Sequence, residues 1–241
     1  MGVFRFEPHT HTGETSKCGR IPARELVDLY KKMGFSGIAI TDHLHESYID
    51  YLYCFDDWNT CVDRFLDGYR RAKTRGDEVG LSVTLGMELR FLENDNDYLV
   101  YGIDEAWLRA HPYPYRMGPE AFFQTFGAEL LIIHAHPFRA GNTFVRANCV
   151  HGIEVVNTHP EHPNFNERAL ALSKEVPTLY RLAGSDTHRK GQEGKAWVEF
   201  DRAIVSSKEY RNAIVRGGYR LGCALEDGQA VIADMETYFG K

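Results

Sequence analysis

Short apolar runs alternate with amphipathic stretches along most of the chain. The apolar runs predict buried strands at 3–6, 37–40, 81–87, 98–101, 130–133, 152–156, 178–183 and 196–200. Stretches with helical spacing of apolar residues lie between them, at 23–33, 58–75, 104–110, 119–128, 165–175 and 206–216. This alternation predicts an α/β fold with a largely parallel sheet covered on both faces. No linker or repeat interrupts it, so we expect a single domain over residues 1–241.

Polar residues follow directly after several of these predicted strands. The first run leads into His9 and His11, and side chains two residues apart on a strand point to the same side. Both imidazoles can therefore face one point in space. Histidines and carboxylates occupy the corresponding positions after later runs, and the full set is His9, His11, His43, Glu88, His136, Asp186 and His188. In α/β barrels the active site lies at this carboxyl end of the strands.

Imidazole and carboxylate groups without thiolate pairs are donors that suit Zn, Mn or Fe. Seven such residues exceed the three or four ligands of one catalytic zinc. The pattern therefore predicts two to three divalent transition metals, with Glu88 as a carboxylate that bridges two of them. The alternative for each histidine is a hydrogen-bonded surface or core residue, but the shared placement at strand ends disfavours it for the whole set.

Composition narrows the range of partners. The 241 residues, 43% of them hydrophobic, suffice for one large core, and the net charge is −6. No run of lysine and arginine is present, so broad nucleic-acid binding and membrane-surface binding are not expected. No apolar run approaches the roughly 18 residues that span a bilayer, and we expect no signal peptide. Five cysteines form no CxxC pair, which indicates reduced thiols and a cytoplasmic location.

Five short motifs resemble, in order, those of the polymerase and histidinol phosphatase (PHP) superfamily. They are His9-Thr10-His11-Thr12, Thr41-Asp42-His43, Gly86-Met87-Glu88, His136-Pro137 and Gly184-Ser185-Asp186-Thr187-His188. The resemblance runs from about residue 4 to about residue 190. Segments 14–19, 136–139 and 154–162 also resemble a subgroup of free-standing members. The resemblance implies a distorted (β/α)7 barrel, similar to a TIM barrel, and metal-dependent phosphoester hydrolysis, often with three metals.

The resemblance also implies which residues hold each metal. Four residues would hold the first metal: His9, His11, Glu88 and Asp186. Glu88 would bridge to a second metal, which His136 would also bind. A third metal would belong to His43 and His188.

The chain departs from the family pattern at two positions. The family's third-metal ligand, six residues after the second motif histidine, is usually aspartate or histidine, whereas this chain has Lys17. A lysine ammonium has no acceptor and repels a cation. Glu14 or Cys18 could take its place, or the third metal is weak or absent. Members often carry a second-metal histidine just before a strand, and Asp97 falls near that position and could serve as the ligand.

Further side chains are candidates for contacts with substrate or metal. Arg139 could grip a phosphate through paired hydrogen bonds, the alternative being a surface salt bridge. His134 either faces the site or packs in the interior. His159 and His162 lie in a proline-rich loop and could touch metal or substrate, and Lys17 could neutralise a phosphate.

The sequence therefore predicts a metal-dependent phosphoesterase for a small phosphorylated substrate. Two metals would share a hydroxide whose pKa they lower, and this metal-bound hydroxide would attack phosphorus. The metals and Arg139 would offset charge on the phosphoryl oxygens. His43 or His188, where not tied to a third metal, could protonate the leaving oxygen. Two alternatives are an amidohydrolase-type hydrolase or deaminase on the same ligands and a non-catalytic metal-binding domain.

Overall fold

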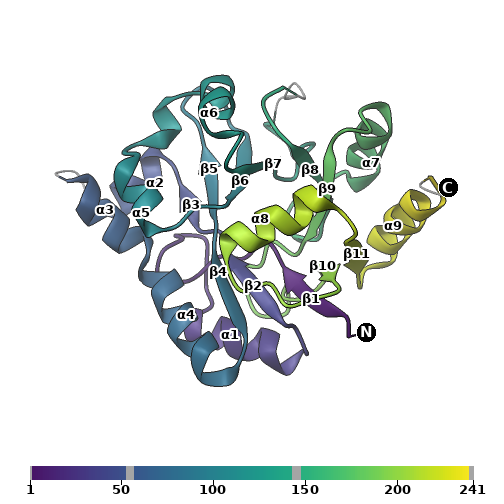
Figure 1. The fold of residues 1–241 in the computed structure, drawn as a ribbon, viewed down its shortest axis with the longest axis horizontal. Coiled ribbons are helices and arrows are strands. Elements are labelled where there is room, and N and C mark those ends of the chain that lie inside the picture. The colour runs from purple at the N-terminus through teal and green to yellow at the C-terminus, as the bar shows by residue number, and fades with distance from the viewer. Residues whose placement is uncertain (1, 53–56, 143–147, 239–241) are drawn as a thin grey trace.

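Two mixed β-sheets form the framework of this computed structural model, which describes residues 2–52, 57–142 and 148–238 (Figure 1). One sheet has the strand order β11 (Arg220–Cys223), β10 (Ala196–Phe200), β1 (Phe4–Glu7), β2 (Gly37–Ile40) and β4 (Ser82–Leu85). The other has the order β3 (His43–Leu44), β5 (Met87–Arg90), β6 (Asp97–Tyr101), β7 (Leu131–His134), β8 (Gly152–Asn157) and β9 (Tyr180–Gly184). Cys54, one of the cysteines behind the reduced-thiol prediction, lies outside the described residues.

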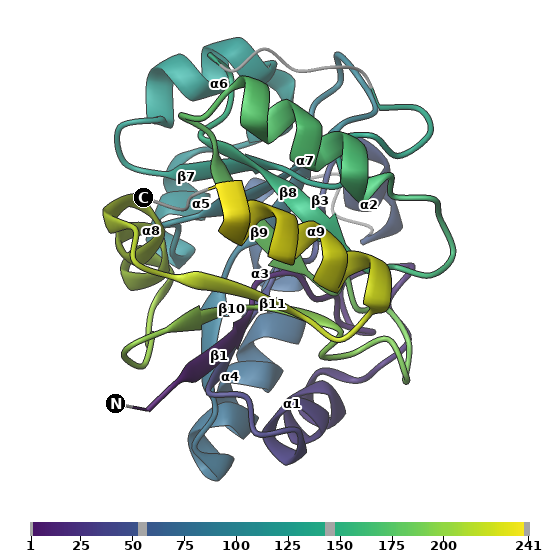
Figure 2. The same cartoon turned by 90° about the vertical axis from the view of Figure 1, so that its right-hand side faces the viewer.

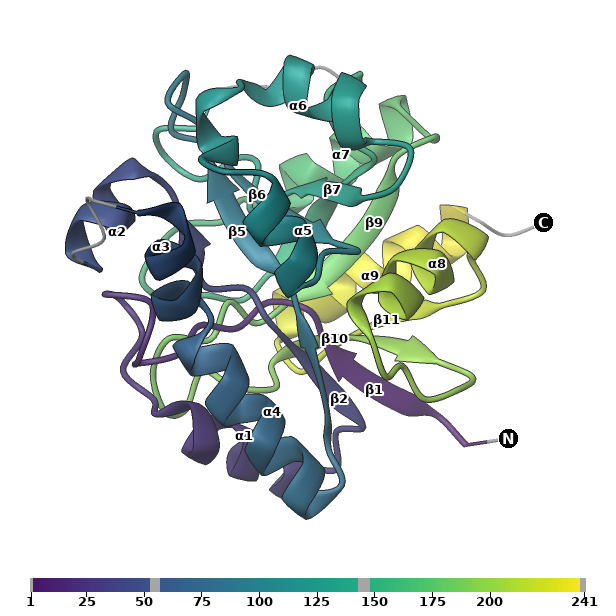
Figure 3. The same cartoon turned by 60° about the vertical axis from the view of Figure 1, so that its left-hand side comes forward.

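Helices cover the outer faces of both sheets. The helices α1 (Ala23–Lys32) and α4 (Asp67–Val79) lie side by side against β2 and β4 (Figure 3). On another side, α7 (Asn166–Glu175) and α9 (Glu226–Tyr238) lie next to each other, beside β8 and β11 (Figure 2). The remaining helical segments are α2 (Glu46–Tyr51), α3 (Trp58–Phe65), α5 (Glu105–Ala110), η1 (Pro114–Arg116), α6 (Pro119–Phe126) and α8 (Ser207–Arg216). None of the helices in the described ranges is both long and apolar enough to cross a membrane.

The helix α1 shows why the amphipathic pattern gives this arrangement. Its residues Leu26, Val27 and Tyr30 are fully buried, whereas Lys31 and Lys32 are exposed at the last turn. Pro22 precedes the first turn, where its missing N–H costs no helical hydrogen bond. The buried stripe faces the sheet, and packing of this kind is how helices in proteins gain most of their stability.

An apolar cluster lies beneath the carboxyl ends of the strands that carry the polar motifs. Phe6 of β1 stacks on Tyr210 of α8 with 4.9 Å between ring centroids. Leu99 of β6 and Ile133 of β7 belong to the same cluster. The hydroxyl of Tyr101 donates to the carbonyl of Pro8 at 2.9 Å, directly before the first motif histidine. This packing fixes the end of β1 and so the position of His9 and His11, which follow it.

The predicted largely parallel sheet needs correction, because the strand pairing is mixed. The pairs β1–β2, β2–β4, β3–β5, β7–β8 and β8–β9 are parallel, but β1–β10, β10–β11, β5–β6 and β6–β7 are antiparallel. Apolar runs identify strands without encoding their direction. The loop from 91 to 96 is short enough to join β5 and β6 as antiparallel neighbours, whereas a parallel pair needs a longer crossover.

Two predicted elements are divided in the structure. The predicted helix 58–75 consists of α3 and α4, which meet at buried Leu66. The predicted strand 81–87 divides into β4 and β5 at Gly86, and Glu88 lies within β5 rather than after a strand end. A Cβ at Gly86 would come within 2.9 Å of the Thr41 methyl and 3.2 Å of the Tyr101 ring, so only glycine fits here.

Hydrogen bonds connect the two sheets at the site. Gly86 N donates to Ile40 O at 2.8 Å and Glu88 N donates to Asp42 O at 3.1 Å, which continues the parallel pairing from β2–β4 into β3–β5. Thr10 and Thr187 form a parallel bridge beyond β1 and β9. These contacts bring the polar ends of several strands together. The (β/α)7 barrel and its restriction to one domain stay predictions.

Candidate metal centre

Glu88 lies at the centre of four imidazoles. Its Oε1 atom is 3.4 Å from His9 Nε2 and 3.1 Å from His136 Nε2. Its Oε2 atom is 3.3 Å from His11 Nε2 and 2.9 Å from His43 Nδ1. The structure therefore places both oxygens of one buried carboxylate between two pairs of ring nitrogens.

Asp186 forms a second centre beside Glu88. Its Oδ1 atom lies 3.4 Å from His9 Nε2, 3.3 Å from His11 Nε2 and 3.4 Å from His188 Nδ1. His9 and His11 thus face both carboxylates, while His188 faces Asp186. The structure brings together all seven residues of the predicted strand-end set.

Backbone hydrogen bonds and unusual dihedrals hold these side chains in place. His11 N donates to Thr187 O at 3.0 Å, which ties the end of β1 to the segment that carries Asp186. Asp186 has φ of 54° and His136 has φ of 31°, both in the left-handed region that non-glycine residues seldom adopt. Such conformations cost free energy and are concentrated at functional sites.

The ring and carboxylate atoms that face inward suit divalent metal ions. Within the described ranges, several buried atoms at this centre lie 2.9–3.4 Å from one another without forming regular hydrogen bonds: His9 Nε2, His11 Nε2, His43 Nδ1, Glu88 Oε2 and Asp186 Oδ1. Leaving buried polar atoms unpaired is unfavourable, and a cation satisfies several of them at once. Three sets of side chains offer ligand atoms within 4.8 Å of one another: His9, His11 and Asp186; His43, Glu88 and Asp97; and His11, Cys18, His43 and His188. Nitrogen and oxygen donors of this kind fit Zn, Mn or Fe.

The electrostatics keep both carboxylates ionised. Burial opposes ionisation of Glu88, but His43 and His9 outweigh it and hold its pKa well below the usual range. Burial likewise opposes ionisation of Asp186, and His9, Arg139 and His188 hold its pKa well below the usual range. Burial, together with His188 and His43, lowers the pKa of His11 far below its ordinary value. The centre thus offers anionic oxygens and a neutral imidazole, the protonation states that metals bind.

Glu154, in the middle of β8, orients two of the histidines. Its Oε1 accepts a hydrogen bond from His9 Nδ1 at 2.8 Å. Its Oε2 accepts from the backbone N–H of His136 at 2.9 Å and from Asn157 Nδ2 at 3.0 Å. The sequence prediction did not give Glu154 a role. The available signal was a carboxylate inside an otherwise apolar strand, which needs buried partners.

Glu7 accepts a hydrogen bond from the backbone of His9, and the sequence prediction gave it no role either. Its Oε1 accepts from the backbone N–H groups of His9 and Ser185, both at 3.0 Å. Its Oε2 accepts from the hydroxyl of Tyr30 at 3.0 Å. Burial raises the pKa of Glu7 to about 7 despite these hydrogen bonds. Gly184 makes room for this packing, because a Cβ there would lie 2.8 Å from the Cβ of His9.

The loop after His11 directs three predicted residues in different directions. Lys17 is exposed, and its Nζ lies 6.0 Å from the ring centroid of Tyr51, away from the candidate metal ligands. The carboxylate of Glu14 accepts from the backbone N–H of Ala23 at 3.1 and 2.9 Å, at the start of α1. Cys18 instead lies among His11, His43 and His188. The structure brings Cys18 to the centre and does not bring Glu14 or Lys17 there.

Asp97 reaches the edge of the centre while paired with an arginine. Its Oδ2 lies 3.9 Å from His136 Nε2, and it groups with His43 and Glu88. Both of its oxygens accept hydrogen bonds from Arg90, at 2.8 and 2.7 Å. His134, by contrast, packs on the ring of Tyr98 with 5.4 Å between centroids, and burial together with His136 lowers its pKa to about 3.

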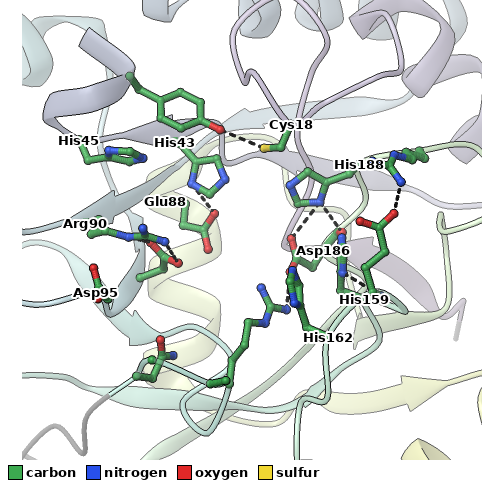
Figure 4. Close-up of a pocket in the computed structure, with 18 residues that line it drawn as sticks. Cys18, His43, His45, Glu88, Arg90, Asp95, His159, His162, Asp186 and His188 are labelled. Carbon is green, nitrogen blue, oxygen red and sulfur yellow. Dashed lines mark hydrogen bonds and ion pairs between the residues drawn. The ribbon is translucent and has the colours of Figure 1, made fainter. Parts of the chain in front are cut away.

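A cavity of about 490 Å³ opens over the centre (Figure 4). His159 and His162 line it, and His159 lies edge-on to His188 with 4.9 Å between ring centroids. His45 also lines the cavity although it was not predicted, and its spacing of two from His43 was the available signal. The cavity therefore extends beyond the seven predicted ligands, and additional imidazoles line it.

Arg139 lies in the wall of this cavity beside Asp186. Its Nη2 atom donates to Asp186 Oδ2 at 2.8 Å, to Asn164 Oδ1 at 2.9 Å and to Asn157 Oδ1 at 3.1 Å. The alternative to a phosphate contact was a surface salt bridge. Arg139 does form an ion pair, but its partner is Asp186, a buried candidate metal ligand, and not a surface carboxylate. The asparagines hold the guanidinium at the cavity wall.

The fold and the imidazole–carboxylate cluster define an α/β protein able to bind metals. Residues 7–215 match the PHP domain family, and the chain belongs to this family. This match confirms the resemblance found in the motifs. None of the curated proteins matches the sequence at a significant level.

Solved structures share the fold at low sequence identity. PsfC from Pseudomonas syringae PB-5123 matches with a TM-score of 0.66 and 16% identity, over 99% of this chain and 98% of that one. A two-domain protein from Bacteroides vulgatus ATCC 8482, described as containing a predicted PHP-like metal-dependent phosphoesterase, matches with a TM-score of 0.63 and 14% identity. That match covers 97% of this chain and 70% of the other.

Proposed function

We propose that the chain is a phosphoesterase that uses two to three divalent ions, Zn, Mn or Fe, to hydrolyse a small phosphorylated substrate. One observation carries this proposal. Both central carboxylates, Glu88 and Asp186, line one cavity together with His43 and His188, and the guanidinium of Arg139 lies in its wall beside Asp186. A metal centre beside a fixed guanidinium suits a phosphoryl group, whose oxygens accept both kinds of contact.

Each group has a distinct part in the reaction. When bound, the ions supply Lewis-acid activation of water and of the phosphoryl group. Arg139 binds and orients the phosphoryl oxygens through its fork of N–H donors. His43 and His188 line the cavity, and when no third ion is bound either one can donate a proton to the leaving oxygen. Burial opposes protonation of His188, but Asp186 outweighs it and raises its pKa, which favours this donor role.

The cavity supports a small substrate rather than a polymer. Its volume of about 490 Å³ lies in the range of sites for small molecules. The net charge of −6 and the absence of a basic run also disfavour broad nucleic-acid binding. We further propose that this centre is built on a single (β/α)7-type barrel and that the protein acts in the cytoplasm, consistent with cysteines that form no CxxC pair.

A phosphoester panel on protein reconstituted separately with Mn, Zn and Fe tests the proposal. Hydrolysis of at least one small phosphoester is expected, with KM raised and kcat lowered in Arg139→Ala. Arg24→Ala is a matched control, since Arg24 pairs with Glu78 on the surface. Metal-loaded protein that hydrolyses no phosphoester would favour a non-catalytic metal-binding domain. An amidase or deaminase activity that survives Arg139→Ala would favour the amidohydrolase-type alternative.

A further inference from the structure

The thiol of Cys18 lies beside two of the cavity's histidines. In Figure 4 its sulfur lies between the rings of His43 and His188. Cys18 Sγ is 3.1 Å from the hydroxyl of Tyr48. The side chain is only partly exposed and lines the cavity, so it is accessible to an ion that enters there.

His11 gives a second, independent sign of a ligand at this place. Its ring lies between those of His43 and His188, with centroid distances of 4.5 and 4.2 Å. The side chain is fully buried, and its Nε2 forms no regular hydrogen bond within the described residues, although it lies 3.3 Å from both Glu88 Oε2 and Asp186 Oδ1. Each neutral imidazole has one ring nitrogen with a free lone pair, and a shared cation would satisfy such nitrogens on several rings at once.

The loop that carries Cys18 is tied to the strand that carries His43. Ser16 Oγ donates to Asp42 Oδ1 at 2.7 Å and accepts from the backbone N–H of His43 at 3.2 Å. At Gly19 a Cβ would lie 2.4 Å from the carbonyl oxygen of Thr12, so only glycine fits at this position. Cys18 is thus held at a fixed distance from His43, while Lys17 projects outward.

We propose that Cys18, His43 and His188 form a thiolate-containing position for a third ion, with His11 at its boundary with the carboxylate positions. One atom from each of the four side chains lies within 4.8 Å of the others. A thiolate with imidazoles is a donor set for Zn, Fe or Co, and it disfavours Mn and Mg, which prefer oxygen. The inference rests on the proposed metal centre and adds that its third position is selective for thiophilic metals.

Tyr48 acts on this position through the sulfur. Its hydroxyl, 3.1 Å from Cys18 Sγ, can donate a hydrogen bond to a thiolate and so orient it. We therefore treat Tyr48 as a positioning residue for Cys18. Its removal should alter the spectrum of a metal bound by the thiolate without abolishing binding.

Cobalt reconstitution of the full-length protein tests the proposal by absorption and by metal content. Wild-type protein loaded with Co²⁺ should show a near-ultraviolet thiolate-to-cobalt charge-transfer band. Cys18→Ser should lose this band together with about one metal equivalent per chain. Cys18→Asp should regain the equivalent without the band, and should bind Mn²⁺ there more tightly than wild-type protein does. Tyr48→Phe should keep the band at a shifted energy.

A matched control removes a cysteine outside the cavity. Cys223→Ser should leave the band and metal content unchanged, because Cys223 is buried near α9 and its Sγ donates to Leu225 O, a contact that a hydroxyl can replace. A wild-type spectrum without the charge-transfer band, or a band and full metal content that survive Cys18→Ser, would overturn the proposal. Phosphoester hydrolysis that persists in that case would leave the proposed function standing. An intact band in protein inactive on every phosphoester would instead reject the proposed function alone.

Discussion

Glu154 Oε1 accepts a 2.8 Å hydrogen bond from Nδ1 of His9, a residue 145 positions earlier in the chain. The bond places the ring proton on Nδ1 and leaves Nε2 facing Glu88 and Asp186. It therefore selects the tautomer of His9 that can bind a metal. Because Glu154 also accepts from the backbone N–H of His136, one carboxylate fixes both of the histidines that face Oε1 of Glu88.

Glu154→Gln should weaken metal binding without unfolding the protein. The amide has one acceptor oxygen, so it cannot serve His9, His136 and Asn157 together. Substitution of a residue that hydrogen-bonds to a metal ligand typically reduces metal affinity by about 10–100-fold. Titration against a chromophoric chelator would measure the change. Glu167→Gln, on the exposed face of α7, is the matched control and should leave the affinity unchanged.

Glu88→Gln should remove metal and activity together. The substitution keeps the shape of the side chain but replaces a carboxylate that contacts four imidazoles with a neutral amide. Elemental analysis of the purified variant should show at least one metal equivalent fewer per chain than wild type. A variant with full metal content and near-normal turnover would show that Glu88 is a structural residue of β5.

The positions of the ligand candidates could be predicted from sequence because each lies in a short local motif. The strand ends before His9, His136 and Asp186 are visible as apolar runs that stop at polar residues. Glu7 and Glu154 could not be found in this way, because their partners come from distant parts of the chain. Their only local signal is a charge within a buried strand.

The loop after His11 shows a second limit of motif alignment. Counting residues from the second histidine leads to Lys17, but in the folded loop, which passes close to Thr12 at Gly19, it is Cys18 that lies among the histidines. The mixed direction of the strands was missed for a similar reason. Whether β5 and β6 are antiparallel depends on the connection between them, and the apolar pattern of each strand is the same in either direction.

Removing metal from the protein should lower its thermal stability. Without the ion, the buried nitrogen and oxygen atoms that form no regular hydrogen bonds would lose the contacts that the ion supplies. At a metal concentration of about 100 times Kd, binding contributes about 2.7 kcal/mol, which corresponds to a rise in Tm of roughly 5–10 °C for a chain of this size. Scanning calorimetry of chelator-treated protein, with and without added Zn²⁺, would measure the difference. Equal Tm values would contradict a metal site in this position.

Arg90→Met should make the protein less stable without metal and more responsive to it. The guanidinium of Arg90 donates to both oxygens of Asp97, and Asp97 is 4% exposed. Methionine keeps much of the apolar stem but leaves a buried carboxylate without its counter-charge, close to Glu88. Breaking a partly buried pair of this kind should cost about 1–3 kcal/mol, less than for a fully buried pair because Arg90 is half-buried.

The same change frees Asp97 to bind an ion together with His43 and Glu88, the residues with which it groups. The rise in Tm on adding Zn²⁺ should therefore be larger in Arg90→Met than in wild type, since the ion replaces the lost positive charge. Arg71→Met is the matched control, because Arg71 makes an exposed 2.9 Å pair with Asp67 and its loss should change stability by less than about 0.5 kcal/mol. A metal-induced Tm rise in Arg90→Met that merely equals the wild-type value would show that Asp97 is bound to Arg90 for structural reasons and takes no part in the metal centre.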